Sequence, residues 1–328
     1  MAILIAATGS HVLASWLKVK TIAAQAFTFG KPNGKPPAFL AGSSVADYGI
    51  AWGQVSTQQD LEIKVWGIAG ASPYEEEQFQ KQVPEARTTF LVVSAVDLDE
   101  AAVSDFRAAI VPLGQSIQTL RATRADWQQW KQTLNQYPLT WLRTLFPTLG
   151  RSRGIMGMLR QNVANWIKPA SQTSETMAGP TIKFGKNTDD DEYRQQRMSD
   201  WSESKIIGKL VAIKMDFHGP HVFNGVKRLA FARMLRFGLQ RGRTIVVVLP
   251  VSPAYSKEFM PPENAKRFED GLAELQRGAP GSEWLRLDQL SGLAEAENFC
   301  DLDHLNVFGR QIATETLLTY LKRPAPQP

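Results

Sequence analysis

The stretch Pro37-Ala38-Phe39-Leu40-Ala41-Gly42-Ser43-Ser44-Val45 decides how the rest of the chain is interpreted. Its apolar residues 38–41 have turn-forming residues on both sides, which is typical of a short strand buried in a parallel sheet. The strand runs into Gly-Ser-Ser, and a serine placed directly after such a strand is a candidate nucleophile. The alternative for Ser44 is an ordinary helix N-cap, because serine is among the residues preferred at that position.

Strands and helices alternate along the chain before and after one long interruption. Besides residues 38–41, we expect strands at 62–66, 88–94, 244–250 and 284–287. We expect helices at 47–57, 74–82, 222–240, 262–277 and 307–321. Alternation of this kind predicts a parallel sheet with right-handed crossovers and with helices on both faces. The sequence therefore predicts a three-layer α/β/α sandwich built on a five-stranded sheet.

Residues from about 100 to 215 interrupt the alternation, and we expect them to form a helical insertion. Residues 105–124 and 125–136 have a helical period, whereas Ser171 to Arg194 is polar and predicts a mobile loop. The expected organisation is a helix and linker over residues 1–35, followed by one α/β domain over 36–328 that carries the insertion.

The N-terminal residues 1–17 are mostly apolar and are followed by Lys18 and Lys20. A helix that crosses a bilayer needs roughly 20 apolar residues, so this run is somewhat short. It also lacks the preceding basic region of a signal peptide. A membrane anchor and a plain amphipathic or buried helix both fit. The single cysteine, Cys300, excludes an intrachain disulfide but does not fix the compartment.

The charge of the chain is mildly basic, with a formal net charge of +5. This excess is too small and too scattered to indicate a nucleic-acid partner. Residues 127–174 contain basic residues interleaved with tryptophans and no acidic residue. Such a segment suits an anionic membrane surface or polymer. The alternative is a solvated basic face over an ordinary helical cap.

The expected partners of Ser44 lie far downstream, in Asp301-Leu302-Asp303-His304. A serine hydroxyl is a weak nucleophile that needs an imidazole to accept its proton and a carboxylate to orient that imidazole. Ligand sites of parallel sheets lie beyond the carboxyl ends of the strands, where this segment and Ser44 are both expected. We assign His304 as the base and Asp301 as the orienting carboxylate. Asp303 is a competing carboxylate whose spacing fits less well, and a structural capping role is the alternative for His304.

Other candidate residues follow the strands at the same edge of the expected sheet. The backbone N–H groups of Ser44 and Gly70 are the expected oxyanion donors. Asp97 follows the third strand and is a candidate substrate ligand; a loop carboxylate without a function is the alternative. His218 and His221 flank Gly-Pro, which favours a loop, and a metal site would need further ligands. We therefore expect no metal and no cofactor, with the two histidines as candidate substrate contacts.

At these residues the chain resembles the SGNH (GDSL-like) hydrolase superfamily. Gly42-Ser43-Ser44 is similar to the family's Gly-Asp-Ser block, with serine in place of aspartate. Asp301 to Gly309 is similar to its C-terminal Asp-x-x-His block, and Gly70 matches the glycine of its second block best. The resemblance covers roughly residues 36–100 and 205–322 and implies a flavodoxin-like sheet with a Ser44–His304–Asp301 triad. It does not cover the insertion.

One departure from the family pattern bears on the reaction. The family's third block supplies an oxyanion-hole asparagine, whereas the matching stretch here, Ser94-Ala95-Val96-Asp97, has none. This feature, the Gly-Ser-Ser form and the run from Val248 to Tyr255 resemble the acyl-transfer branch. That branch includes D-alanyl-transfer proteins of teichoic acid synthesis and acetyltransfer proteins of exopolysaccharides.

The resemblance implies acyl-ester chemistry, hydrolysis or transfer, on an acylated carbohydrate or related ester. It also implies a membrane-associated or extracytoplasmic location more than a cytoplasmic one. The alternative is a non-catalytic SGNH-like protein that binds a polysaccharide or a membrane partner. The missing asparagine is the main support for that alternative.

Overall fold

The structure is a computed structural model. It describes residues 34–66, 71–101 without 82 and 84, 111–122, parts of 127–138, 192–217 and 221–323. The apolar N-terminal segment 1–17 and most of the basic, tryptophan-containing segment lie outside these residues. Gly70 and His218 lie outside them as well. Among the described helices, none is long and apolar enough to cross a membrane.

The core of the fold is one sheet of five strands that all run parallel, in the order β2-β1-β3-β4-β5. The strands are β1 (Pro37–Ala41), β2 (Glu62–Trp66), β3 (Thr88–Val93), β4 (Arg243–Val248) and β5 (Glu283–Arg286). This order and direction confirm the predicted three-layer α/β fold with a flavodoxin-like sheet.

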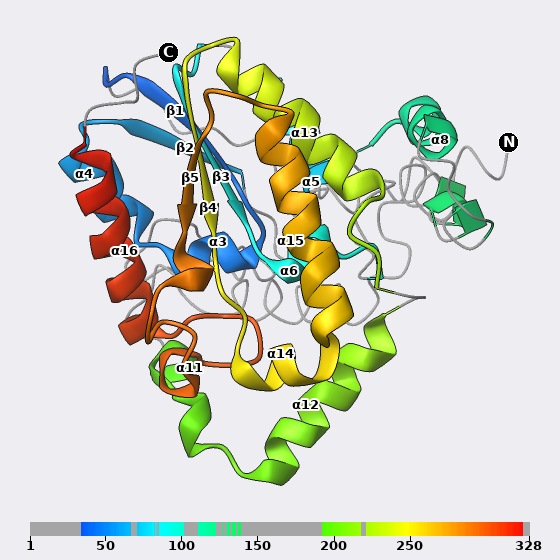
Figure 1. Ribbon diagram of the computed structural model, residues 1–328. Helices are drawn as coiled ribbons and strands as arrows, with labels where there is room; N and C mark the ends of the chain where they lie inside the picture. The colour runs from blue at the N-terminus through cyan, green and yellow to red at the C-terminus, as the bar shows by residue number, and fades with distance from the viewer. Residues whose placement is uncertain are drawn as a thin grey trace, which may run out of the picture.

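Helices cover both faces of the sheet, with α16 and α4 on one side and α13 and α15 on the other (Figure 1). The helices before the gap in the described chain are α3 (Ser44–Gly49), α4 (Trp52–Gln58), α5 (Pro73–Gln80), α6 (Ala95–Leu98) and α8 (Leu113–Ala122). Those after it are α11 (Glu192–Gln195), α12 (Glu203–Asp216), α13 (Val226–Leu239), α14 (Pro253–Phe259), α15 (Pro262–Arg277) and α16 (Val307–Leu321). Short 3₁₀ turns are η1 (Met198–Asp200), η2 (Leu287–Gln289) and η3 (Ala296–Asn298).

Alternate residues along each central strand enter two separate cores. Leu40, Phe90 and Ile245 stand side by side in the strand register and pack toward the α16 face. Leu91 and Val246 are likewise neighbours and pack toward the α13 face. Because both faces are covered, the strands are apolar at successive positions, which is the pattern that identified them in the sequence.

The predicted helix at 47–57 is wrong in one respect, because it is two helices that break at Ile50 and Ala51. Ile50 is extended and fully buried, and the Ala51 N–H donates to Thr314 Oγ1 at 2.9 Å. The Trp52 indole N–H donates to the Ala46 carbonyl at 2.9 Å, which folds α4 back against α3. Tertiary packing of Ile50 and Trp52 therefore overrides the continuous helical pattern.

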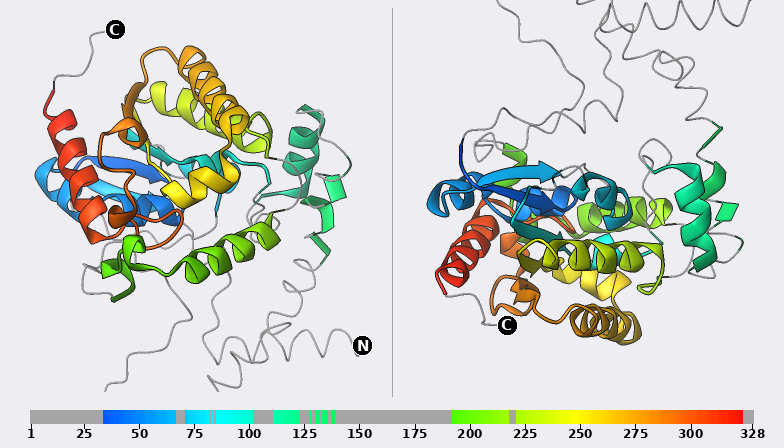
Figure 2. Two further views of the ribbon diagram at one scale, coloured as in Figure 1. Left: turned by 60° about the horizontal axis from the view of Figure 1, so that its bottom comes forward. Right: turned by 90° about the horizontal axis from the view of Figure 1, so that it is seen from above.

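The predicted loop at 171–194 is also wrong at its end, because Glu192–Gln195 forms the short helix α11. Figure 2 shows α11 and α12 (green) beside the α/β body, at the edge where the strands end. Part of the insertion thus returns to the sheet before α13 resumes the α/β pattern.

Gly42 lies between β1 and α3, where the backbone packs closely against α3 and β3, and a substitution there tests this close packing. A Cβ placed there would lie 2.4 Å from Ala46 Cβ and 3.1 Å from Val92 Cβ, and neither short side chain can move away. We expect Gly42→Ala to lower the free energy of unfolding by about 1–3 kcal/mol, measured by urea denaturation.

The matched control is Gly53→Ala in α4, where a Cβ would meet nothing within 4 Å. It should leave stability unchanged or raise it by up to about 1 kcal/mol. Equal effects of the two substitutions would contradict the assigned close approach at Gly42.

Candidate active site

Ser44 lies at the carboxyl end of β1, as the first residue of α3. The helix N-cap is its neighbour Ser43, whose Oγ accepts a hydrogen bond from Val45 N at 3.2 Å. The capping alternative for Ser44 is therefore wrong, since Ser43 takes that role. The hydroxyl of Ser44 does not cap the helix and is available to residues that follow other strands at the same end of the sheet.

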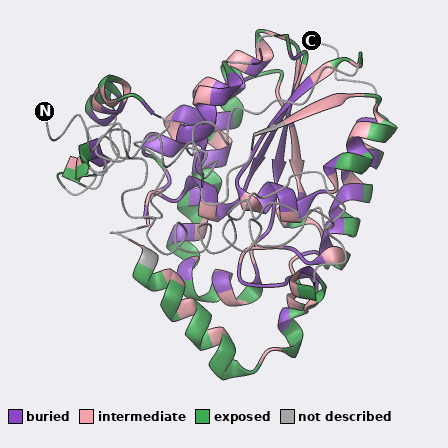
Figure 3. Cartoon of the chain, turned by 180° about the vertical axis from the view of Figure 1, so that it is seen from behind, coloured by how far each residue is buried: buried purple, intermediate pink, exposed green. Residues whose placement is uncertain are grey.

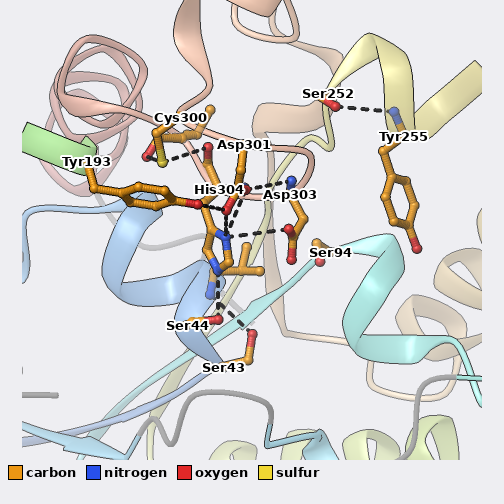
Figure 4. A network of polar contacts seen from close by, with 12 residues as sticks. Ser43, Ser44, Ser94, Tyr193, Ser252, Tyr255, Cys300, Asp301, Asp303 and His304 are labelled. Atoms are coloured by element: carbon orange, nitrogen blue, oxygen red, sulfur yellow. Dashed lines mark hydrogen bonds and ion pairs between the residues drawn. The ribbon is translucent and has the colours of Figure 1, made fainter. Parts of the chain in front are cut away.

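Ser44, His304 and Asp301 form one continuous chain of hydrogen bonds (Figure 4). The Ser44 Oγ lies 2.8 Å from His304 Nε2, although 260 residues separate the two positions. On the other side of the ring, His304 Nδ1 lies 2.9 Å from each carboxylate oxygen of Asp301. The structure thus brings together the three residues predicted from the sequence, in the geometry that a serine nucleophile requires.

The loop before α16 is shaped by the carboxylate of Asp301. Its Oδ1 accepts backbone hydrogen bonds from Asp303 N at 3.0 Å and His304 N at 2.8 Å. The loop is closed by Cys300 N, which donates to the His304 carbonyl at 3.0 Å. Asn306 caps α16, because its Oδ1 accepts from the backbone N–H groups of residues 308 and 309. The helix-capping alternative for His304 is therefore wrong.

Asp303 also reaches the imidazole, with Oδ1 3.4 Å from His304 Nδ1. This distance is longer than the 2.9 Å of Asp301, so Asp301 is the better hydrogen-bond partner. Burial raises the pKa of Asp303 to about 6, with a further contribution from the neighbouring charge of Asp301. Asp303 therefore adds a second carboxylate beside the ring without replacing the first.

The charge balance around His304 favours the imidazolium. Burial alone would lower the pKa of His304, but the fields of Asp303 and Asp301 outweigh it and raise the pKa to about 9. Burial by itself would raise the pKa of Asp301. The positive charge of His304 and the hydrogen bond from His304 outweigh burial and lower the pKa of Asp301. The two carboxylates thus stabilise a proton on the imidazole, which is the state that follows proton transfer from a serine. The neutral imidazole is the form that accepts this proton, and its fraction increases as the pH rises toward about 9.

Two residues of α11 complete the site, and the sequence interpretation missed both. Tyr193 OH donates to Asp301 Oδ2 at 2.5 Å. Burial and this hydrogen bond raise the pKa of Tyr193, so the phenol keeps its proton and remains a donor. Arg194 is buried and forms an ion pair with Asp47 Oδ2 at 2.6 Å, which ties α11 to α3.

An aromatic side chain links these residues to the imidazole. The Arg194 guanidinium lies 4.0 Å from the centre of the Tyr48 ring, and the Tyr48 and His304 ring centres are 4.5 Å apart. Tyr193 and Arg194 belong to a polar stretch without an apolar period, so no local pattern marked them. The one sequence feature that could have indicated them was Asp47. A carboxylate on the first turn of a buried helix requires a cation as its partner.

Asp97 is buried between the end of β3 and the N-cap of α3, whereas a carboxylate exposed at the rim was predicted for a substrate ligand. Its side chain is buried, and Oδ2 accepts from Ser94 N at 2.7 Å and Ser94 Oγ at 2.8 Å. Burial raises the pKa of Asp97, and hydrogen bonds from Ser43 and Ser94 oppose that increase. Asp97 thus connects the end of β3 to the cap of α3, and its position does not fit an exposed substrate contact.

His221 lies in a second histidine–carboxylate pair. Its Nδ1 is 2.5 Å from Asp99 Oδ2, and this hydrogen bond raises the pKa of His221. The ring packs edge-on against Phe217 at a centre distance of 5.1 Å and remains partly exposed. Among the described residues, no hydrogen bond joins the His221–Asp99 pair to Ser44, His304 or Asp301.

Asp301, Asp303 and His304 also form the one cluster with potential metal ligands among the described residues. Both ring nitrogens of His304 already interact with side chains, Nε2 with Ser44 and Nδ1 with Asp301. A cation here would have to replace one of those hydrogen bonds. Cys300 beside them is buried, and burial raises the pKa of its thiol, so it is a poor nucleophile.

A hollow of about 720 Å³ is lined by residues of α4, α11 and α16 and by the chain after α11. Its lining includes Gln54, Gln195, Gln196, Arg197, Phe308 and Gln311. Gln195 is two positions beyond Tyr193, and Phe308 is four positions beyond His304. The lining also includes the carboxylates of Asp200 and Glu315, so amide, guanidinium and carboxylate groups surround one aromatic ring. Such a set suits a polar ligand with many hydroxyl groups.

Comparison with protein-family models gives no match, and comparison with curated proteins finds no significant sequence relative.

The two carboxylates beside His304 lead to a titration prediction. Replacing Asp303 by asparagine removes one negative charge from the imidazolium, so the pKa of His304 should fall by about one pH unit or more. The measurement is an NMR titration of the imidazole nitrogens, with the wild-type midpoint expected above the ordinary value of about 6.5.

Glu263→Gln, on the exposed start of α15, removes an equal charge far from the ring and should leave the midpoint unchanged. A His304 midpoint that is the same in wild type and Asp303→Asn would show that Asp303 does not act on the imidazole.

Proposed function

We propose that this protein is an SGNH-type serine enzyme that transfers an acyl group from an ester through an acyl-enzyme. The observation that carries this proposal is the hydrogen-bonded series Ser44 Oγ, His304 Nε2, His304 Nδ1 and Asp301. In that arrangement each group performs the role that nucleophilic catalysis at serine requires.

The first half-reaction forms the acyl-enzyme. Ser44 Oγ attacks the carbonyl carbon of the ester while Nε2 of the neutral His304 imidazole accepts the hydroxyl proton. The tetrahedral intermediate collapses, the bond to the alcohol oxygen breaks, and His304 returns the proton to the departing alkoxide. Asp301 holds Nδ1 and stabilises the imidazolium between these two transfers.

The second half-reaction releases the acyl group by the same steps in reverse order. A hydroxyl oxygen attacks the acyl-enzyme, gives its proton to His304 and receives the acyl group, and Ser44 regains its proton. Water as the acceptor makes the protein an esterase, and a sugar hydroxyl makes it an O-acyltransferase.

The developing oxyanion needs hydrogen-bond donors near Ser44. We assign the Ser44 N–H to this role, because the first N–H groups of a helix have no intrahelical acceptor. Gly70 is the second donor expected from the sequence and lies outside the described residues. The region after β3, where the family places an asparagine, holds the buried Ser94–Asp97 pair.

We further propose an O-acylated carbohydrate, of the cell envelope or exported, as the substrate class. The Gly-Ser-Ser form and the absent asparagine favour the acyl-transfer branch that the sequence resembles. The polar hollow lined by residues of α4, α11 and α16 offers hydrogen-bonding groups to a hydroxyl-rich ligand, although no triad residue lines it. An envelope substrate also agrees with a membrane-associated or extracytoplasmic location.

The nucleophile assignment is tested by a fluorophosphonate probe that reacts covalently with activated serines. Wild-type protein should be labelled at Ser44, as mapped by mass spectrometry, and Ser44→Ala should not be labelled. Asp301→Asn should slow labelling on the order of 10⁴-fold, because the imidazole loses its orienting anion.

Ser43→Ala is the neighbouring control, and it should retain labelling at Ser44. Persistent labelling in Ser44→Ala would end the proposed assignment. No labelling of a folded wild-type protein would favour the non-catalytic polysaccharide-binding alternative.

The acceptor is tested by the fate of the acyl-enzyme formed from a soluble acetyl ester. If a sugar hydroxyl is the acceptor, a polysaccharide with free hydroxyls should raise ester turnover several-fold and become acetylated. The control is the same polysaccharide with its hydroxyls methylated. Equal turnover with both polymers and acetate as the sole product would assign the protein as an esterase.

A further inference from the structure

Helix α12 is apolar on two opposite sides. Ile206, Leu210 and Ile213 pack against the core on the α16 side of the sheet. Ile207, Val211 and Met215 face outward, with 52%, 52% and 76% of their surface exposed. Residues four apart lie above one another on a helix, so the outward residues form one continuous stripe.

The residues beside this stripe are small and leave it uncovered. Gly208 and Ala212 lie beside it and are exposed, and a Cβ at Gly208 would meet nothing within 4 Å. At about 100° per residue, the outward arc from Ile207 to Ala212 spans roughly 140° of the helix, and Ser204 in the first turn is the one hydroxyl residue within it. A globular protein normally presents polar residues on that side of a surface helix.

Lysines border the outward arc on both sides. Lys205 lies on one margin, with Nζ 3.7 Å from the centre of the Trp201 ring, and Lys214 lies on the other, paired with Glu258. A third lysine, Lys209, is exposed farther round the Lys205 side. The two acidic residues of the helix, Glu203 and Asp216, stand at its two ends.

The location of α12 leaves the stripe accessible. The helix runs along the edge of the body below the carboxyl ends of the strands (Figure 1), where α3 and α14 also lie. Viewed from behind, α12 is exposed along most of its length, in contrast to the helices on the sheet (Figure 3). Three of the six large apolar side chains exposed among the described residues belong to this one helix.

We propose that the outer face of α12, formed by Ile207, Val211 and Met215 between Lys205 and Lys214, binds an anionic lipid surface. In-plane amphipathic helices bind membranes in this manner, with apolar side chains among the acyl chains and lysines at the level of the headgroups. Long lysine side chains can extend from the margins of such a face to the phosphate layer.

The same features argue against a second copy of the chain as the occupant. Two α12 stripes packed together would bring the lysine margins of both copies close to each other, and like charges oppose such contact. The helix has 14 residues, which is about 21 Å of length. Three side chains on a helix of that length offer much less area than a stable dimer buries.

This inference is independent of the proposed reaction at Ser44, because it rests on other residues. Residues 1–17 are a second apolar segment, so the experiment must report on α12 itself and not on membrane binding of the whole chain. Cys300 is buried and is the one cysteine of the chain, so a new surface cysteine can be labelled selectively.

The test uses full-length Val211→Cys carrying an environment-sensitive fluorophore such as nitrobenzoxadiazole. Vesicles with phosphatidylglycerol should shift its emission to the blue, and vesicles of phosphatidylcholine alone should do so much less. The matched control is Ile312→Cys, an exposed apolar position on α16, which should show no shift.

A second variant tests the stripe. Ile207→Ser with Met215→Ser, added to Val211→Cys, should weaken binding to the anionic vesicles at least about tenfold as measured by the blue shift. Ile312→Ser in the same background should not weaken it.

Two outcomes would overturn the proposal. One is an unchanged Val211→Cys emission while the protein sediments with the vesicles. The other is a blue shift that grows with protein concentration in the absence of lipid, which would indicate self-association through α12. The α12 variants should still be labelled at Ser44 by the fluorophosphonate, so failure of the lipid proposal can be distinguished from failure of the proposed reaction.

Discussion

The Asp301 carboxylate is the interaction on which the site depends, because it accepts hydrogen bonds from four groups at once. They are the backbone N–H of Asp303, the backbone N–H of His304, the imidazole Nδ1 of His304 and the phenol of Tyr193. The two backbone bonds shape the loop, and the two side-chain bonds fix the imidazole and attach α11. A buried carboxylate requires this degree of compensation, since an unpaired charge in the interior is very costly.

The carboxylate can occupy this place because an isolated antiparallel bridge and the start of α16 hold its loop. The antiparallel bridge between Phe299 and Leu305 closes the loop, and the Asn306 cap starts α16 directly after it. On the opposite side, β1 delivers Ser44 to the same rim through Gly42 and the Ser43 cap. The 2.8 Å contact between Ser44 and His304 is thus set by backbone features on both sides.

Tyr193 and Arg194 show why the site extends beyond the α/β core. The buried ion pair of Arg194 with Asp47 joins the end of the insertion to the helix that carries the nucleophile. Breaking one partner of such a pair leaves an uncompensated buried charge, so the position of α11 is strongly coupled to α3. The insertion therefore takes part in building the site as well as in bordering it.

The sequence by itself determined the strand positions and the α/β alternation, and it led to the prediction of Ser44, His304 and Asp301 as a triad. Apolar strands buried on both faces and short motifs after them are local features, which survive without knowledge of the fold. Only the tertiary structure decided the break at Ile50, the cap at Ser43 and the burial of Asp97. It alone also decided the attachment of Tyr193 and Arg194. Each of these depends on partners distant in the chain, such as Thr314 for Ala51 and Asp47 for Arg194, and no local pattern encodes such contacts.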